Sequence, residues 1–285
     1  MKKTVLVTGG NGQLGQCIQS IAEQYSTLDF LFVDKNILDI TNAAAVLKFF
    51  EIHPIDWCIN CAAYTAVDNA EVNEELAYQV NVIGARNIAQ ACQKNNSKLI
   101  HISTDFVFDG SNSKPYKEAD NVNPQGVYAR TKRNGEIEVK DTCSSSFIIR
   151  TSWLYSEFGH NFMKTMLRLA SERDLLTVVN DQIGSPTYAI DLAEALMQII
   201  LKNKDNYGIF HYSNQGESSW FEFAKSIFNL TNSHITLKPI LTKDYFTLAK
   251  RPKYSVLDTS KISEEFSLKI PFWEDSLGKA LSKVK

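Results

Sequence analysis

Residues Thr4–Gly15, TVLVTGGNGQLG, decide the fold of this 285-residue chain. A short β-branched run ends in glycines and passes directly into a helical pattern of apolar residues at Leu14, Ile18 and Ile21. Glycines at such a junction allow a tight turn and close approach to a pyrophosphate, and the helix N-terminus offers free N–H groups to phosphate. The stretch therefore predicts a dinucleotide-binding turn, with expected contacts at Gly9, Asn11, Gly12, Gln13, Leu14 and Gly15.

An acidic residue at the end of the second expected strand supports this interpretation over a glycine turn used only for packing. Asp34 follows the apolar run 31–33 and lies 19 residues after Gly15, where a carboxylate binds the adenine ribose hydroxyls. That position favours NADH, but the adjacent Lys35 would tolerate a 2′-phosphate. Both NADH and NADPH are therefore candidate cofactors.

Strands and helices alternate outward from the glycine turn over the first 150 residues. Strands are expected at 4–7, 31–33, 57–60, 98–103 and 147–150, and helices at 42–51, 74–94 and 128–140. This alternation predicts an α/β fold of the Rossmann type, a doubly wound parallel sheet with its ligand beyond the carboxyl ends of the strands.

The alternation loosens after Thr151, where a smaller C-terminal substrate lobe is expected. We predict a dinucleotide-binding domain over 1–150, with 176–202 returning to it, and an interleaved substrate-binding lobe formed by 151–175 and 203–285. A cleft between the two parts is the expected ligand site.

Composition limits the classes of partner. The chain is 44% hydrophobic and 22% charged, with a formal net charge of −2, which is typical of a globular protein and argues against a general nucleic-acid binder. No apolar run approaches the roughly 20 residues of a membrane span, and glycines interrupt the first apolar run too early for a secretory leader. We therefore expect a cytoplasmic protein without a nucleic-acid or membrane partner.

The Cys58-x-x-Cys61 spacing is the one pattern here that could indicate a metal or redox site. It falls on an expected buried strand, where side chains three apart point to opposite faces, and no second pair of ligands follows at zinc spacing. We therefore expect no metal, and interpret these cysteines as small hydrophobic residues.

A second group of residues indicates proton transfer. Tyr128 and Lys132 lie four apart on one face of an expected helix, and a nearby ammonium favours the phenolate of a tyrosine whose pKa is ordinarily about 10. Thr104 ends the preceding strand and could hold a substrate carbonyl beside the phenol. We predict Thr104, Tyr128 and Lys132 as catalytic residues; an ordinary surface helix is the alternative.

Together, the glycine turn, Thr104, Tyr128 and Lys132 resemble the extended short-chain dehydrogenase/reductase family. A narrower resemblance, to the dTDP-4-dehydrorhamnose reductase family, extends over nearly the whole chain. It is carried by residues 60–71, 103–110, 150–155, 180–187 and 251–252. The resemblance implies reduction of the 4-keto group of dTDP-4-dehydro-L-rhamnose to dTDP-L-rhamnose by NADPH or NADH, a step toward bacterial surface polysaccharides.

The resemblance also implies roles for individual residues. Tyr128 would give a proton to the ketone oxygen, Lys132 would hold the nicotinamide ribose and lower the tyrosine pKa, and Thr104 would hydrogen-bond the reacting oxygen. The adenine and ribose side of the cofactor would be lined by Asp39, Ile40, Ala62, Ala63 and Tyr64.

Four residues are expected to bind the nucleotide-sugar substrate. Asp105 and Trp153 would contact the sugar nucleotide, although Trp153 could instead be a core residue. Asn161 and Arg251 would bind the diphosphate, because a guanidinium matches phosphate geometry; Arg251 could also be a plain surface charge.

Three positions depart from the family pattern. Phe106 replaces a frequent tyrosine, so any polar contact there is lost, and Cys61 replaces a usual alanine. Some relatives form a metal-linked dimer through a glutamate just after the glycine turn, where this chain has Gln16-Cys17. A homodimer of this chain would therefore lack a bridging metal.

Other functions on the same scaffold remain alternatives. A dehydratase would carry a glutamate at position 106, and the phenyl ring of Phe106 cannot abstract a proton. Another sugar-nucleotide reductase or an epimerase would share the site, and only the reductase would oxidise added NADH. A non-catalytic dinucleotide-binding subunit is the remaining alternative, against which the intact Thr104, Tyr128 and Lys132 argue.

Overall fold

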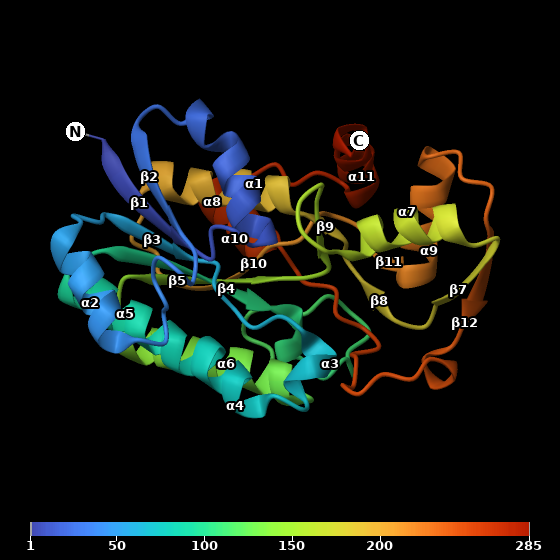
Figure 1. The fold of residues 1–285 in the computed structure, drawn as a ribbon, viewed down its shortest axis with the longest axis horizontal. Coiled ribbons are helices and arrows are strands. Elements are labelled where there is room, and N and C mark those ends of the chain that lie inside the picture. The colour runs from blue at the N-terminus through green and yellow to red at the C-terminus, as the bar shows by residue number, and fades with distance from the viewer. Residues whose placement is uncertain (1, 285) are drawn as a thin grey trace.

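The computed structural model describes residues 2–284, and its centre is a six-stranded parallel sheet in the order β2-β1-β3-β4-β5-β10 (Figure 1). The expected doubly wound, Rossmann-type sheet is confirmed. Strand order reverses at β1, so the carboxyl ends of β1 and β3 form the switch point where such sheets bind ligands. The strands are β1 (Lys3–Thr8), β2 (Leu28–Val33), β3 (Trp57–Asn60), β4 (Lys98–Thr104), β5 (Ser146–Thr151) and β10 (Gly208–His211).

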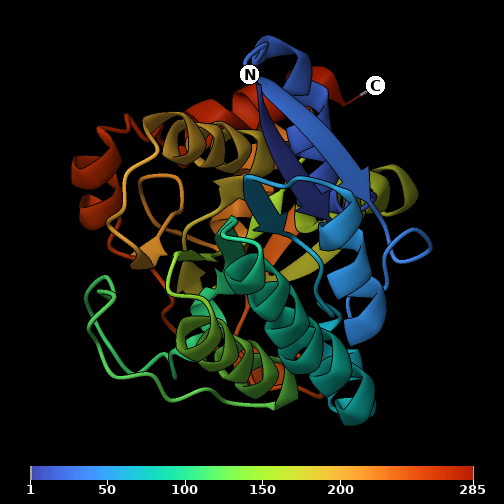
Figure 2. The same cartoon turned by 90° about the vertical axis from the view of Figure 1, so that its left-hand side faces the viewer.

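Helices cover both faces of the sheet (Figures 1 and 2). One layer contains α1 (Gln13–Ile21) and α8 (Ala189–Lys202); the other contains α2 (Ala43–Ile52), α5 (Ala85–Lys94) and α6 (Val127–Thr142). Val5 and Val7 point into the core under α1 and α8, whereas Leu6 points into the core under α2 and α5. Burial on both faces explains why these strands are continuous apolar runs.

The segment expected as one helix over 74–94 contains an irregular turn. It consists of α4 (Glu74–Tyr78), a π-helical turn η2 (Gln79–Gly84) and α5. A short helix α3 (Val67–Ala70) precedes it. The 3₁₀ turns are η1 (Ala22–Gln24), η3 (Asp105–Val107) and η4 (Thr242–Asp244).

The smaller lobe is built on the parallel pair β7 (Leu175–Val179) and β12 (Thr236–Ile240), with helices α7 (Phe162–Glu172) and α9 (Trp220–Leu230). Two short pairs join it to the sheet domain: β6 (Leu154–Tyr155) with β9 (Thr187–Tyr188), and β8 (Ile183–Gly184) with β11 (Ser218–Ser219). The C-terminal helices are α10 (Ser260–Phe266) and α11 (Trp273–Lys283).

Two of the expected segment assignments are wrong. Strand β10 lies within 203–285, expected in the lobe, but pairs with β5 as the edge strand of the main sheet. Strand β7 lies largely within 176–202, expected to return to that sheet, but pairs with β12 in the lobe. Both are short apolar runs, and nothing local in such a run says which distant strand it will pair with.

Cys58 lies in the core under α2 and α5, and Cys61 packs against the core on the other face. Both thiols are free.

Within residues 2–284, no helix is both long and apolar enough to span a bilayer.

Candidate active site

The glycine turn joins β1 to α1 at the switch point of the sheet. Gly9 has a φ of +64°, and a Cβ there would lie 2.8 Å from the backbone nitrogen of Ala62, just past β3. A Cβ on Gly15 would collide with the Gly9 carbonyl. Helix α1 starts after Gly12 with no side-chain cap and no acidic residue in its first turn, which leaves its first N–H groups free. This glycine-lined turn fits a pyrophosphate.

The acid of the second strand is held beside this turn. The Asn11 amide donates a hydrogen bond to Asp34 Oδ2 at 2.6 Å, and Asp34 Oδ1 accepts from the backbone N–H groups of Asn36 and Ile37. The structure thus brings Asn11 and Asp34 together from separate strand ends. A carboxylate fixed in this way fits ribose hydroxyls.

Asp39 and Ile40 occupy the loop between β2 and α2. Burial raises the pKa of Asp39, but hydrogen bonds from the Thr41 hydroxyl and backbone N–H outweigh it and leave the pKa below its usual value. Ile40 is buried, and a Cβ on Gly84 would collide with it. Asp39 therefore orders this loop, and Ile40 packs the loop against the π-helical turn.

Asn81, which our sequence reasoning missed, positions Tyr64. The Asn81 side chain donates to the Tyr64 carbonyl and to the Thr131 hydroxyl, each at 3.1 Å, and accepts from the Tyr64 N–H at 2.8 Å. The residue is buried in the π-helical turn, a feature frequent at functional sites. Periodicity predicts one uninterrupted helix here and carries no signal for this role of Asn81.

Tyr128, Thr104 and Asp105 come together beyond the end of β4. The Thr104 hydroxyl donates to Asp105 Oδ1 at 3.0 Å and accepts from the Phe106 N–H at 3.2 Å. Burial raises the pKa of Tyr128 to about 12; Thr104 opposes this by hydrogen bonding, and the Asp105 carboxylate reinforces it. The phenol therefore holds its proton at neutral pH, as a proton donor must.

Lys132 is buried one turn further along α6, and its Nζ donates to the Ile102 carbonyl at 2.7 Å. Burial lowers its pKa to about 8, against the opposing charge of the Glu136 carboxylate. Burial dominates at the Tyr128 phenol, and the Lys132 ammonium is directed to a backbone carbonyl. The lowering of the Tyr128 pKa by Lys132 stays a prediction.

Asp105 is 2% exposed, and its Oδ2 has no hydrogen-bond partner within residues 2–284. Burial raises its pKa to about 6, outweighing the opposing effects of the nearby Ser255 and Thr104 hydroxyls. A buried acceptor without a partner is uncommon and fits a position where a ligand group is received.

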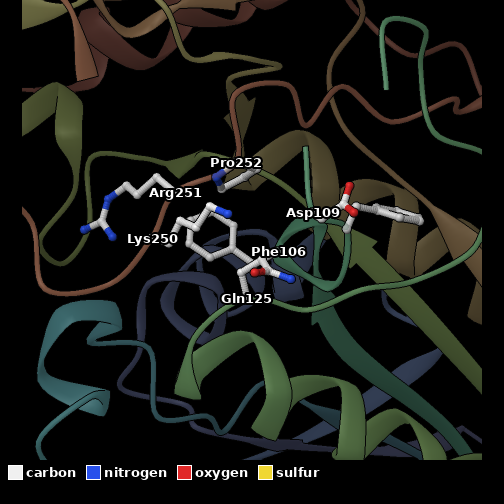
Figure 3. A pocket seen from close by; sticks show the side chains of 7 residues that line it. Phe106, Asp109, Gln125, Lys250, Arg251 and Pro252 are labelled. Atoms are coloured by element: carbon white, nitrogen blue, oxygen red, sulfur yellow. The ribbon is translucent and has the colours of Figure 1, made fainter. Parts of the chain in front are cut away.

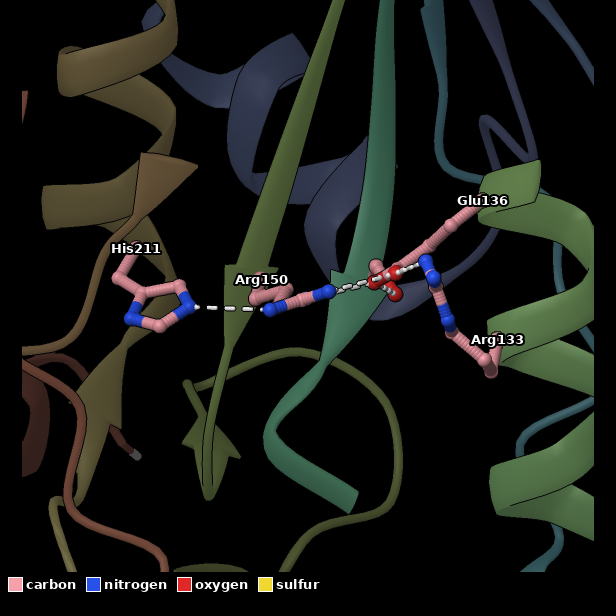
Figure 4. Close-up of polar contacts among 5 residues, drawn as sticks. Arg133, Glu136, Arg150 and His211 are labelled. Carbon is pink, nitrogen blue, oxygen red and sulfur yellow. Dashed lines mark hydrogen bonds and ion pairs between the residues drawn. The ribbon is translucent and has the colours of Figure 1, made fainter. Parts of the chain in front are cut away.

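A buried charge network packs behind α6, the helix that carries Tyr128 and Lys132 (Figure 4). Glu136 accepts two hydrogen bonds from Arg150, both at 2.8 Å, one from Ser103 at 2.6 Å and one from Arg133 at 2.9 Å. Arg150 also reaches His211, on the far side of its guanidinium. Our sequence reasoning missed these residues, although the four-residue spacing from Lys132 to Glu136 would have placed both on one helix face.

Trp153 lies two residues beyond β5 in a left-handed conformation, with a φ of +45°. Its indole stacks on Trp220 of the lobe at 3.5 Å between centroids, and a Cβ on Gly184 would collide with it. A bulky residue with positive φ persists only where its surroundings hold it, and such residues cluster at functional sites. Trp220 was missed because it lies 67 positions further along the chain.

Asn161 does not fit its expected role as a diphosphate ligand. Its Oδ1 caps α7 by accepting from the Lys164 N–H, and its amide donates to Gln13 Oε1 and to the carbonyls of Ser156 and Phe158. These contacts occupy the whole side chain, so Asn161 instead joins α7 to the first turn of α1.

Arg251 lines a narrow pocket beside Phe106 and Gln125, together with Lys250 and Pro252 (Figure 3). Its guanidinium points away from Phe106 and Gln125 and forms an ion pair with Asp68 on α3 at 2.6 Å. Phe106 packs edge-on against Tyr128, with 5.7 Å between ring centroids. Asp68 therefore fixes the direction of the Arg251 guanidinium, which keeps N–H groups for a ligand.

Comparisons with known proteins show the family of this chain. The family model described as "RmlD substrate binding domain" matches residues 1–285. A dTDP-4-dehydrorhamnose reductase from Aggregatibacter actinomycetemcomitans is 42% identical over 283 residues, covering 96% of each chain.

Solved structures agree with this match. A dTDP-4-dehydrorhamnose reductase from Bacillus anthracis, in complex with NADP, is 43% identical with a TM-score of 0.95, covering 99% of this chain and all of that one. Another from Clostridium acetobutylicum is 42% identical with a TM-score of 0.93, covering 98% of each. The chain therefore belongs to the dTDP-4-dehydrorhamnose reductase family, with the fold described above.

Proposed function

We propose that this protein reduces the 4-keto group of dTDP-4-dehydro-L-rhamnose to give dTDP-L-rhamnose, using NADPH or NADH. The observation that carries the proposal is the convergence of a protonated Tyr128 phenol, Thr104 and Asp105 Oδ2, which has no hydrogen-bond partner among the described residues, at the end of β4. These groups lie on the carboxyl edge of the sheet that also carries the glycine turn. The site can therefore hold a dinucleotide and a ketone on the same side of the fold.

Each catalytic residue has a role that its environment supports. The reduced nicotinamide, when bound, supplies the hydride. Tyr128 gives its proton to the oxygen that gains negative charge, and a pKa of about 12 still makes the phenol a stronger acid than the product alcohol. Thr104 hydrogen-bonds the same oxygen. Lys132 holds the nicotinamide ribose. To do so, its ammonium would either leave the Ile102 carbonyl or hydrogen-bond the carbonyl and the ribose together.

The cofactor is held by the glycine turn at its pyrophosphate, by Asp34 at the adenine ribose, and by Ala62, Ala63 and Tyr64 past β3. The Bacillus anthracis relative that binds NADP supports NADPH as a cofactor here, with Lys35 available to a 2′-phosphate. Asp105, Trp153 and Arg251 contact the nucleotide sugar. We also propose that the protein works in the cytoplasm, and that any homodimer forms without a bridging metal.

The test is NADPH and NADH oxidation by the purified protein with dTDP-4-dehydro-L-rhamnose, beside other 4-keto sugar nucleotides. We expect turnover with the rhamnose precursor, abolished in Tyr128→Phe while the NADPH affinity stays within about threefold, since the lost hydroxyl acts on the ketone. Full turnover in Tyr128→Phe would refute the proton-transfer role. Absence of oxidation with every sugar nucleotide would favour a non-catalytic binding protein.

A further inference from the structure

The short helix α3 and the residue after it carry two carboxylates that hold two different parts of the site. Asp68 lies in α3, and Glu71 follows its last residue. Asp68 binds the strap, residues 245–252, which runs from the lobe to α3 (Figure 1). Glu71 binds the first residue of α6, the helix that carries Tyr128.

Glu71 caps the catalytic helix from outside. Helix α6 has Gly126 at its N-cap, with no side-chain cap and no acidic residue in its first turn. Glu71 Oε1 accepts the Val127 N–H at 2.7 Å, directly before Tyr128. Gly126, with a φ of +85°, permits this approach, because a Cβ there would lie 2.6 Å from the same oxygen. A carboxylate at this end also complements the helix dipole.

The hydrogen bond between Glu71 and Val127 also affects the packing around the Tyr128 phenol. Val127 lies in a small apolar cluster with Ala70 and Ala77, and the rings of Tyr64 and Tyr128 pack against it. Glu71 is therefore joined both to the backbone before Tyr128 and, through its neighbour Ala70, to the cluster on which the tyrosine rests. Loss of the cap would loosen the first turn of α6, where Tyr128 is the second residue.

Asp68 holds the strap in two places. Its Oδ1 accepts the Ala249 N–H at 3.0 Å, and its Oδ2 accepts from Arg251 Nη2 at 2.6 Å. One carboxylate thus fixes the strap backbone and the direction of the guanidinium. Arg251 carries five N–H donors, so this contact leaves donors for a phosphate.

We propose that Asp68 and Glu71 are positioning residues that align the Arg251 strap and the Tyr128 helix on a common support, α3. Asp68 acts on binding of the nucleoside diphosphate through Arg251, and Glu71 acts on proton transfer through Tyr128. The inference rests on the proposed reductase function for these two roles. It assigns the two carboxylates to different kinetic constants, because they position residues that act on different ends of the substrate.

The kinetic test compares four variants and a control. Glu71→Ala should lower kcat by about 10- to 100-fold with the KM values within about threefold, since a misplacement of about 1 Å costs up to 100-fold. Asp68→Ala should raise the KM for the sugar nucleotide about tenfold with kcat within about threefold. Glu71→Gln keeps an acceptor oxygen and should restore kcat; Asp68→Asn should recover only part of the KM effect. Glu74→Ala, which breaks an exposed α4–α6 ion pair with Arg130, should change neither constant.

Two measurements need no turnover and separate failure of the inference from failure of the proposed function. Glu71→Ala should speed hydrogen exchange at the amides of Val127 and Tyr128, and Asp68→Ala should weaken binding of dTDP about tenfold in calorimetry. An inactive wild-type protein with these two effects would refute the reductase function and retain the positioning roles. Equal losses in both constants for both variants, or unchanged exchange and dTDP binding, would overturn the inference.

Discussion

Asp105 is a buried carboxylate whose ionisation destabilises the folded protein, and the size of that effect is measurable. The residue is 2% exposed, and burial raises its pKa from 3.8 to about 6. That rise corresponds to roughly 3 kcal/mol, at about 1.4 kcal/mol for each pH unit. Because the folded pKa lies above the unfolded one, the destabilisation is absent below about pH 4 and complete above about pH 6.

Asp105→Asn removes the titrating group and keeps the shape of the side chain. We expect the free energy of unfolding of the variant, relative to wild type, to rise by about 3 kcal/mol between pH 4 and pH 7, measured by urea unfolding. Any effect of the new amide that does not depend on pH cancels when the values at pH 4 and pH 7 are compared. Asp109→Asn is the matched control: hydrogen bonds from Ser111 and Asn123 lower the Asp109 pKa to about 2, so its contribution changes only below about pH 4 and its difference should stay nearly constant between pH 4 and pH 7. A pH-independent difference for Asp105→Asn would refute the reasoning.

Three further predictions concern the surrounding structure. Glu136→Ala should cost about 3–5 kcal/mol in urea unfolding, because it leaves the buried Arg150 unpaired, whereas the double variant Glu136→Leu/Arg150→Met should recover most of that loss. His211 is buried in its neutral form, because burial and Arg150 lower its pKa to about 3. The free energy of unfolding should therefore fall by up to about 1.4 kcal/mol per pH unit as the pH falls from 6.5 toward 3. His211→Gln should flatten that slope. Gly9→Ala should weaken NADPH binding at least about tenfold in a fluorescence titration, because the new Cβ would meet the Ala62 backbone and the φ at this position is positive. Unchanged affinity would contradict the fit of the glycine turn to a pyrophosphate.

Local patterns predicted the sheet and the elements that carry the site. The β-branched run before Gly9, the acid at Asp34 and the four-residue spacing of Tyr128 and Lys132 are signals contained within one element or one junction. Each depends on backbone geometry over a few residues, which periodicity and glycine placement report directly.

Contacts between distant segments were beyond such reasoning. The stacking of Trp153 on Trp220 and the pairing of Arg150 with Glu136 depend on how elements pack, and no local pattern encodes that packing. The direction of the Lys132 ammonium is a further case, because it is set by the Ile102 carbonyl on β4.

The position of β10 at the edge of the sheet has a consequence for synthesis of the chain. The edge of β5 stays unpaired until residues 208–211 have left the ribosome, by which time the lobe segments α7 and β7 have already emerged. A nascent chain halted near residue 150 would expose an open strand edge and would lack α8, which packs on α1. The nucleotide-binding part therefore cannot mature before much of the lobe exists, and a fragment cut at residue 150 should aggregate.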